Sequence, residues 1–235
     1  MSAVPALRHV EWRPCWRIVP SRFPPVQLFE RVADPQDLDA ILALESLSNE
    51  RLREARAMPP GAAEAVTGST VIAAAFAYRN PEGSRFSDRT FGVFYAAADL
   101  DTAIAETVHH RERFMRATRQ PRMELDMRVY LTDLAGDLHD LRGRPAAFAD
   151  AYNPSDYAAG QRLARALRAG GSAGIVYDSI RQPGGECAAV FLPQLLSNCR
   201  QERHLCYLWD GGRINAVYEK RALRALTDGG SDASS

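Results

Sequence analysis

Apolar and polar residues follow two different periods along the chain, and each period predicts a different element. At 125–131 apolar residues take every second position, which is the period of a strand with one buried face. At 103–115 apolar residues recur at helical spacing, and Asp99 precedes them where a helix N-cap is expected. Glu106 falls at the edge of the apolar stripe, so we expect it to be neither in the core nor fully exposed.

Further segments of strand and helix character are separated by proline and glycine pairs. Segment 71–78 is apolar throughout, which fits either a buried strand or a short helix. The other predicted elements are a strand at 26–32, a helix at 34–58, a strand at 93–97, a helix from Asn153 to 169, strands at 174–177 and 187–192, and a hairpin of 204–209 with 213–218.

This order of elements predicts an α/β or, more closely, an α+β fold. At 235 residues the chain suits one compact domain, with a small mixed or antiparallel sheet flanked by helices. We expect the domain to span residues 26–225. Residues 1–25 combine repeated prolines with Trp12 and Trp16 and predict an irregular N-terminal extension. Residues 226–235, rich in Gly, Ser and Asp, predict a disordered tail.

Charge and composition narrow the classes of function. The chain has 29 basic and 29 acidic side chains and a formal net charge of zero, which argues against direct nucleic acid binding. It has no signal-peptide pattern and no apolar run long enough to span a bilayer, so we expect a cytoplasmic protein without membrane contact. The 4 cysteines lack the spacing of zinc ligands, so we expect reduced thiols and no metal site.

Three separated motifs carry the candidate chemistry, in a fixed order along the chain. They are Arg31 within Leu-Phe-Glu-Arg-Val at 28–32, then Arg85-Phe86 followed by Gly-Val-Phe-Tyr-Ala at 92–96 and Thr-Ala-Ile-Ala-Glu at 102–106, then Ser179 within Gly-Ile-Val-Tyr-Asp-Ser-Ile-Arg at 174–181. Together these motifs resemble the RES domain, which is named for its Arg, Glu and Ser.

The resemblance implies a fold similar to ADP-ribosyltransferase toxins and an enzyme that consumes NAD. Glu106 would then be the catalytic carboxylate, stabilising the positive charge that develops on the ribose when nicotinamide leaves. Arg31 and Arg85 would bind the pyrophosphate through charge-assisted hydrogen bonds. Ser179 would complete the site with Arg31 and Glu106, and it either bonds the ribose or orients Glu106.

Three residue roles are open on the sequence alone. Phe86 and Tyr95 either stack on nicotinamide or adenine, or belong to the core. The segment 181–185 is either a phosphate-binding loop or, as the glycines favour, a hairpin turn. Ser179 lacks the glycine-flanked turn of a nucleophilic serine, so we do not expect serine-hydrolase chemistry.

The same resemblance implies the toxin of a bacterial type II toxin–antitoxin pair, with an Xre-type helix-turn-helix antitoxin as its partner. Such an enzyme would cleave the nicotinamide–ribose bond of NAD and pass ADP-ribose to water or phosphate. An alternative acceptor is a specific cellular protein. A rival hypothesis from another class is a catalytically silent binding module, in which the arginine and glutamate motifs form a structural ion pair.

Overall fold

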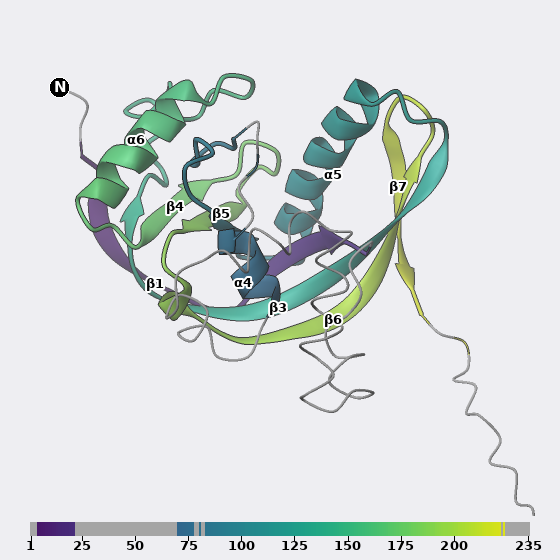
Figure 1. Cartoon of the computed structure of the whole chain (residues 1–235), viewed down its shortest axis with the longest axis horizontal. Coiled ribbons are helices and arrows are strands. Elements are labelled where there is room, and N and C mark those ends of the chain that lie inside the picture. The colour runs from purple at the N-terminus through teal and green to yellow at the C-terminus, as the bar shows by residue number, and fades with distance from the viewer. Residues whose placement is uncertain (1–3, 22–69, 78–79, 81–82, 222, 224–235) are drawn as a thin grey trace, which may run out of the picture.

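The computed structural model describes residues 4–21, 70–77, 80, 83–221 and 223. Its strands are β1 (Ala6–Pro20), β2 (Phe94–Ala97), β3 (Met123–Asp140), β4 (Gly174–Asp178), β5 (Glu186–Val190), β6 (Leu196–Trp209) and β7 (Ile214–Lys220). Its helices are α4 (Thr70–Ala77), α5 (Leu100–Ala117), α6 (Ala158–Ala169) and the 3-10 helix η1 (Pro193–Leu195). The long strands β1, β3 and β6 curve beneath α5, α6 and the β4–β5 pair (Figure 1).

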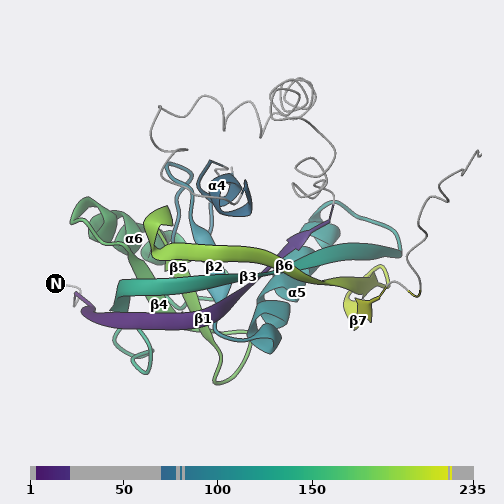
Figure 2. The same ribbon diagram turned by 90° about the horizontal axis from the view of Figure 1, so that it is seen from below.

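The seven strands form one mixed sheet in the order β1-β2-β5-β4-β3-β6-β7. The β3–β4 pairing is parallel and the others are antiparallel. Since β1 pairs with both β2 and β3, the strands β1, β2, β5, β4 and β3 close into a ring. The strands β6 and β7 extend the sheet beyond β3 (Figure 2). The predicted α+β class with a mixed sheet is confirmed.

The N-terminal segment is a strand, and the prediction of an irregular conformation was wrong. β1 pairs along its length with β3, from Ala6 opposite Asp140 to Pro20 opposite Met127. Its one internal proline, Pro14, lies where the register shifts between Trp12 and Cys15. Such an irregularity tolerates a residue that has no N–H to donate, so the prolines do not prevent the strand.

Most of the other predicted elements are confirmed within the described residues. The described part of segment 71–78, residues 71–77, lies in the helix α4, and the alternating segment 125–131 lies within the longer β3. The helix expected from Asn153 begins instead at Ala158. The Asn153 side chain accepts hydrogen bonds from the N–H groups of Ser155 (3.0 Å) and Asp156 (2.9 Å), so it stabilises a turn before the helix. The predictions at 26–32, 34–58 and 226–235 lie outside the described residues.

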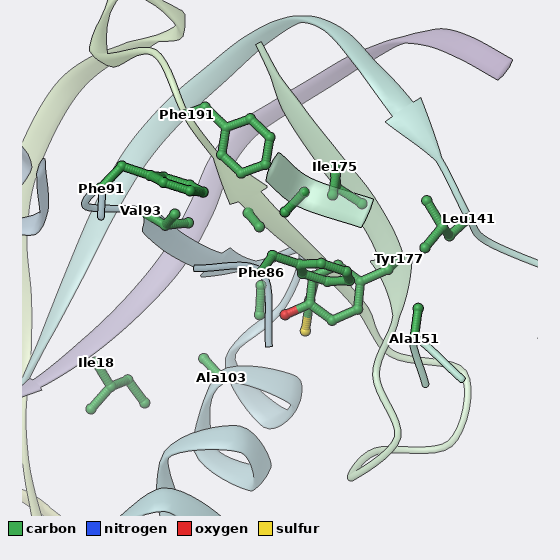
Figure 3. Close-up of a cluster of buried hydrophobic side chains, with 14 of the residues drawn as sticks. Ile18, Phe86, Phe91, Val93, Ala103, Leu141, Ala151, Ile175, Tyr177 and Phe191 are labelled. Atoms are coloured by element: carbon green, nitrogen blue, oxygen red, sulfur yellow. The ribbon is translucent and has the colours of Figure 1, made fainter. Parts of the chain in front are cut away.

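Two apolar clusters fill the two sides of the sheet. One includes Ile72 of α4 with Phe94 and Val190, and the other includes Ala103 of α5 and Leu167 of α6. The second cluster holds the ring pairs Phe86–Tyr177 and Phe91–Phe191 (Figure 3), with centroids 4.9 and 5.7 Å apart. None of the helices in the described part of the chain has the length and apolar character needed to cross a membrane.

Candidate active site

The helix α5 sets the position of Glu106. Its N-cap is Asp99, whose Oδ1 accepts from the N–H of Thr102 and whose Oδ2 accepts from the Thr102 hydroxyl, each at 2.7 Å. Such a cap is worth about 1 kcal/mol to a helix. Because the cap fixes where the helix begins, it also fixes the direction of Glu106, which is half-buried as the helical periodicity predicts.

The turn after β4 brings Ser179 against Glu106. The Ser179 hydroxyl donates to Oε1 of Glu106 at 2.6 Å. The Ser179 oxygen itself accepts from the N–H groups of Arg181 (3.1 Å) and Gln182 (3.0 Å). With both lone pairs engaged, the hydroxyl has one proton left to give, and Glu106 receives it. Of the two roles left open by the sequence, the contact with Glu106 is the one present in the structure.

The loop that carries Ser179 is a hairpin connection packed tightly on α5. Asp178 pairs with Glu186 across the hairpin, and the Ser179 N–H donates to the Gly185 carbonyl at 2.8 Å. A Cβ on Gly185 would lie 2.2 Å from Oγ1 of Thr102, so no larger residue fits without displacement. The loop and the N-cap of α5 therefore hold each other in place, and with them Ser179 and Glu106.

Two neutral groups lie next to the Glu106 carboxylate. The Cys187 thiol is 4.0 Å from Oε1 of Glu106. Burial, followed by the charge of Glu106, raises the pKa of Cys187. Burial likewise raises the pKa of Tyr177 well above its ordinary value, and Cys187 and Glu106 add to the effect. Both groups stay protonated at neutral pH, so the negative charge at this spot belongs to Glu106.

Arg85 lies on the same side as Glu106 and is only 9% exposed. Its Nη1 donates to the carbonyls of Ala151 (2.8 Å) and Asn153 (2.9 Å), and its guanidinium carbon lies 4.9 Å from the centre of the Tyr157 ring. Within the described residues Arg85 has no carboxylate partner. Its positive charge therefore remains available to an anion.

Phe86 and Tyr95, which were candidates for stacking on a ligand, belong to the core instead. Phe86 is 1% exposed and its ring packs edge-on against Tyr177. The Tyr95 hydroxyl accepts from the Phe86 N–H at 2.9 Å and shares a hydrogen bond with Ser84 at 2.7 Å. These contacts hold the Arg85 loop against β2, which is a packing function. Of the two roles open for these rings, the core role is the one that the structure supports, and a contact of either ring with a ligand stays a prediction.

Sequence reasoning missed Tyr157 and considered Arg181 only as part of the loop 181–185. The Nη2 of Arg181 donates to the Pro154 carbonyl at 2.8 Å, which directs this side chain toward the segment that carries Tyr157. Burial, followed by the charges of Arg181 and Arg113, lowers the pKa of the half-buried His109 on α5. The charge of Arg181 therefore reaches the stretch of α5 that carries His109. The nearness of Arg181 to Ser179 in sequence was a usable signal, whereas nothing in the sequence singled out Tyr157.

Arg31 lies outside the described residues, so its predicted contact with pyrophosphate stays a prediction. Among the residues that the structure describes, no group of three or more His, Cys, Asp or Glu side chains is arranged to hold a metal ion. Within the described residues the site is thus a carboxylate held by a hydroxyl and flanked by the neutral Cys187 and Tyr177.

The fold and the site together define an α+β protein with a half-buried carboxylate that a neighbouring hydroxyl holds in place. Residues 61–210 match the family model of the RES domain. The chain is also 32% identical over 213 residues to the uncharacterized protein y4oC of Sinorhizobium fredii (strain NBRC 101917 / NGR234), with 86% of each chain covered. The chain belongs to the RES domain family.

Among solved structures, the chain is similar to one in the crystal structure of the M. tuberculosis MbcT-MbcA toxin-antitoxin complex. The similarity covers 83% of this chain and 85% of that chain, with a TM-score of 0.44 and 11% sequence identity. At these values we draw no argument from it. Of the family motifs, Arg85, Glu106 and Ser179 lie within the matched residues, and Arg31 precedes them.

Proposed function

We propose that this protein cleaves the bond between nicotinamide and ribose in NAD and passes the ADP-ribose to water or phosphate. The observation that carries the proposal is the 2.6 Å hydrogen bond from Ser179 to the half-buried Glu106. It leaves a carboxylate with a fixed direction and one oxygen, Oε2, without a hydrogen bond in the described part of the chain. A fixed, partly desolvated carboxylate is the group that an oxocarbenium-like transition state requires.

The leaving group explains why the site needs little acid catalysis. The nicotinamide ring of NAD is already cationic and departs neutral, so no proton has to be delivered to it. The nearest titratable groups, Cys187 and Tyr177, keep their protons at neutral pH. Electrostatic stabilisation by Glu106 and orientation of the acceptor are then the main contributions of the chain.

Two unpaired arginines support binding of the pyrophosphate. Arg85 and Arg181 both donate to carbonyls of the segment 151–154, and neither has a carboxylate partner among the described residues. Two guanidinium groups match the two negative phosphates of NAD, and the Tyr157 ring next to Arg85 offers a surface for a base. Arg31 would add a third cation, as its motif predicts.

The structure offers no support for the rival hypothesis of a silent module held by an Arg–Glu ion pair. Within the described residues Glu106 forms no ion pair, and its hydrogen bond comes from a hydroxyl. We therefore assign the arginines to ligand binding and Glu106 to the reaction.

The biological role that fits this activity is that of a toxin. We propose that the protein arrests growth by consuming NAD and that a helix-turn-helix antitoxin of the Xre type neutralises it, as membership of the RES domain family suggests. The antitoxin would act most directly by covering the Glu106 site. A specific cellular protein as acceptor is the alternative outcome that the experiment below distinguishes.

The test uses purified, antitoxin-free protein incubated with NAD in buffer, in buffer with phosphate, and in cell extract. We expect nicotinamide release in buffer or with phosphate, together with free ADP-ribose or its phosphate. Label from radioactive NAD on a discrete protein band would replace the proposed acceptor by a protein. Intact NAD in all three conditions, with a correctly folded protein, would contradict the proposal.

A further inference from the structure

A polar depression lies on the opposite side of the sheet from Glu106. Its volume is about 460 Å³, and it is lined by Ser21, Asp126, Arg128, His204, Lys220 and Arg221. Met127 and Val129 on either side of Arg128 belong to the apolar cluster that includes Ala103 of α5. Since side chains alternate along a strand, Arg128 faces the side away from α5. The proposed reaction therefore makes no use of this depression.

Three of the lining residues form one row across adjacent strands. Arg128 of β3 is opposite His204 of β6, and His204 is opposite Lys220 of β7. Directly opposed residues of an antiparallel pair have side chains on the same face, about 5 Å apart. The row thus brings two cationic side chains, Arg128 and Lys220, to either side of the His204 ring, whose Nε2 shares a hydrogen bond with Gln201 at 2.8 Å.

The acidic residues nearby neutralise only part of this row. Lys220 pairs with Asp126 at 2.5 Å and with Glu124 at 3.4 Å, and Arg221 pairs with Glu219. Arg128 forms no ion pair within the described residues, although only 8% of its surface is exposed. A buried guanidinium without a counter-charge is unfavourable, because its desolvation is not compensated.

Arg128 and Ser21 also have hydrogen-bonding capacity to spare. The Nη2 of Arg128 donates to the Ser21 carbonyl at 3.2 Å, but the Nε of Arg128 and the Oγ of Ser21 are buried and find no partner in the described part of the chain. Buried polar atoms are nearly always paired in folded proteins. Two unpartnered donors in the wall of one depression, beneath a basic row, indicate a missing acceptor with negative charge.

We propose that this depression binds a phosphate group, held by Arg128 and Ser21 at its base and by His204, Lys220 and Arg221 at its rim. A phosphate dianion supplies several acceptor oxygens and the counter-charge that Arg128 lacks among the described residues. The volume exceeds that of one phosphate and falls in the range of small-ligand sites, so the group belongs either to free phosphate or to a phosphate ester. The site is independent of the proposed NAD reaction.

The test follows NMR signals of the Arg128 Nε–H and the His204 ring while inorganic phosphate or ribose 5-phosphate is added at constant ionic strength. We expect a saturable shift of both signals. Loss of the charged hydrogen bonds in Arg128→Met should weaken binding by about tenfold to a hundredfold. Arg162→Met removes the same charge from an exposed position on α6 and should leave the affinity unchanged.

The two probes separate the sources of the phosphate group. Equal affinity for both indicates free phosphate, and tighter binding of ribose 5-phosphate indicates an ester. If Arg128→Met does not fold, His204→Ala and Lys220→Met alter exposed residues of the same row, and each should weaken binding by about threefold to tenfold. Glu106→Gln should leave this affinity unchanged, which separates the site from the proposed NAD site.

Two results would overturn the proposal. One is the absence of a saturable shift at Arg128 and His204 with either phosphate probe. The other is a shift that persists with the same affinity in Arg128→Met or, if that variant is unfolded, in both rim variants.

Discussion

Replacing Ser179 by alanine removes the 2.6 Å hydrogen bond that orients the Glu106 carboxylate. A hydrogen bond to a charged group is worth about 1.5–3 kcal/mol. Because the bond orients the group that stabilises the transition state, most of this energy should appear in kcat, as a loss of about tenfold to a hundredfold. The KM for NAD should change little, since Ser179 is a positioning residue.

The same substitution also leaves two backbone N–H groups, those of Arg181 and Gln182, without their acceptor. Ser179 is buried, so these donors lose their acceptor away from solvent, and we expect a loss of stability of about 1–3 kcal/mol. Thermal unfolding of Ser179→Ala should therefore show a lower Tm for a protein that still folds. Ser179→Thr keeps a hydroxyl and should recover most of the lost kcat.

A double-mutant cycle decides whether Ser179 acts through Glu106. If it does, adding Ser179→Ala to a Glu106→Gln enzyme should lower kcat little further, because the carboxylate that the hydroxyl orients is already gone. Wild-type kcat in folded Ser179→Ala would refute the reasoning. So would two losses that simply multiply in the double variant.

Three further outcomes follow from the structure. Arg181→Met should raise the KM for NAD by about tenfold and leave nicotinamide release at saturating NAD largely intact, because a guanidinium without a carboxylate partner among the described residues contributes mainly to binding. An unchanged KM would remove Arg181 from the site. Gly185→Ala places a Cβ 2.2 Å from Oγ1 of Thr102, so it should lower both Tm and kcat, whereas Gly211→Ala, at a glycine with open space around it, should lower Tm without changing kcat. Burial raises the pKa of Tyr95 to about 12, above its ordinary value of 10.0, so stability should fall between pH 10 and 12 as the unfolded chain ionises first. Denaturant unfolding across this window should show a shallower fall of stability for Tyr95→Phe, by up to about 1.4 kcal/mol per pH unit. An identical slope in the two proteins would contradict the assignment.

The helix and the strand that carry the site were predictable, because each follows from a pattern within one short stretch of sequence. The helix from Asp99 and the strand ending before Ser179 each follow from local patterns, and the family motif then predicts that Glu106 and Ser179 meet. The direction of the Ser179 proton was not predictable, because it depends on hydrogen bonds that the hairpin loop supplies. Tyr157 was missed because its position depends on packing against Arg85 across the fold.

The remaining differences have physical causes of the same kind. The role of Phe86 was open on the sequence, and only the closure of the core around Tyr177 shows that its ring is buried. The strand β1 was mistaken for an irregular segment because proline was counted as a strand breaker. Its pairing partner β3 is more than a hundred residues away in sequence, and that long-range ladder outweighs the local propensity.

The central claim is that the Glu106 carboxylate drives the cleavage of NAD. The most direct measurement is the rate of nicotinamide release by wild-type protein, by Glu106→Gln and by Asp101→Asn, which removes a carboxylate from an exposed position on the same helix. The account predicts a loss of about 10²–10³-fold for Glu106→Gln and a wild-type rate for Asp101→Asn, both with a native Tm. A folded Glu106→Gln protein that releases nicotinamide at the wild-type rate would contradict it.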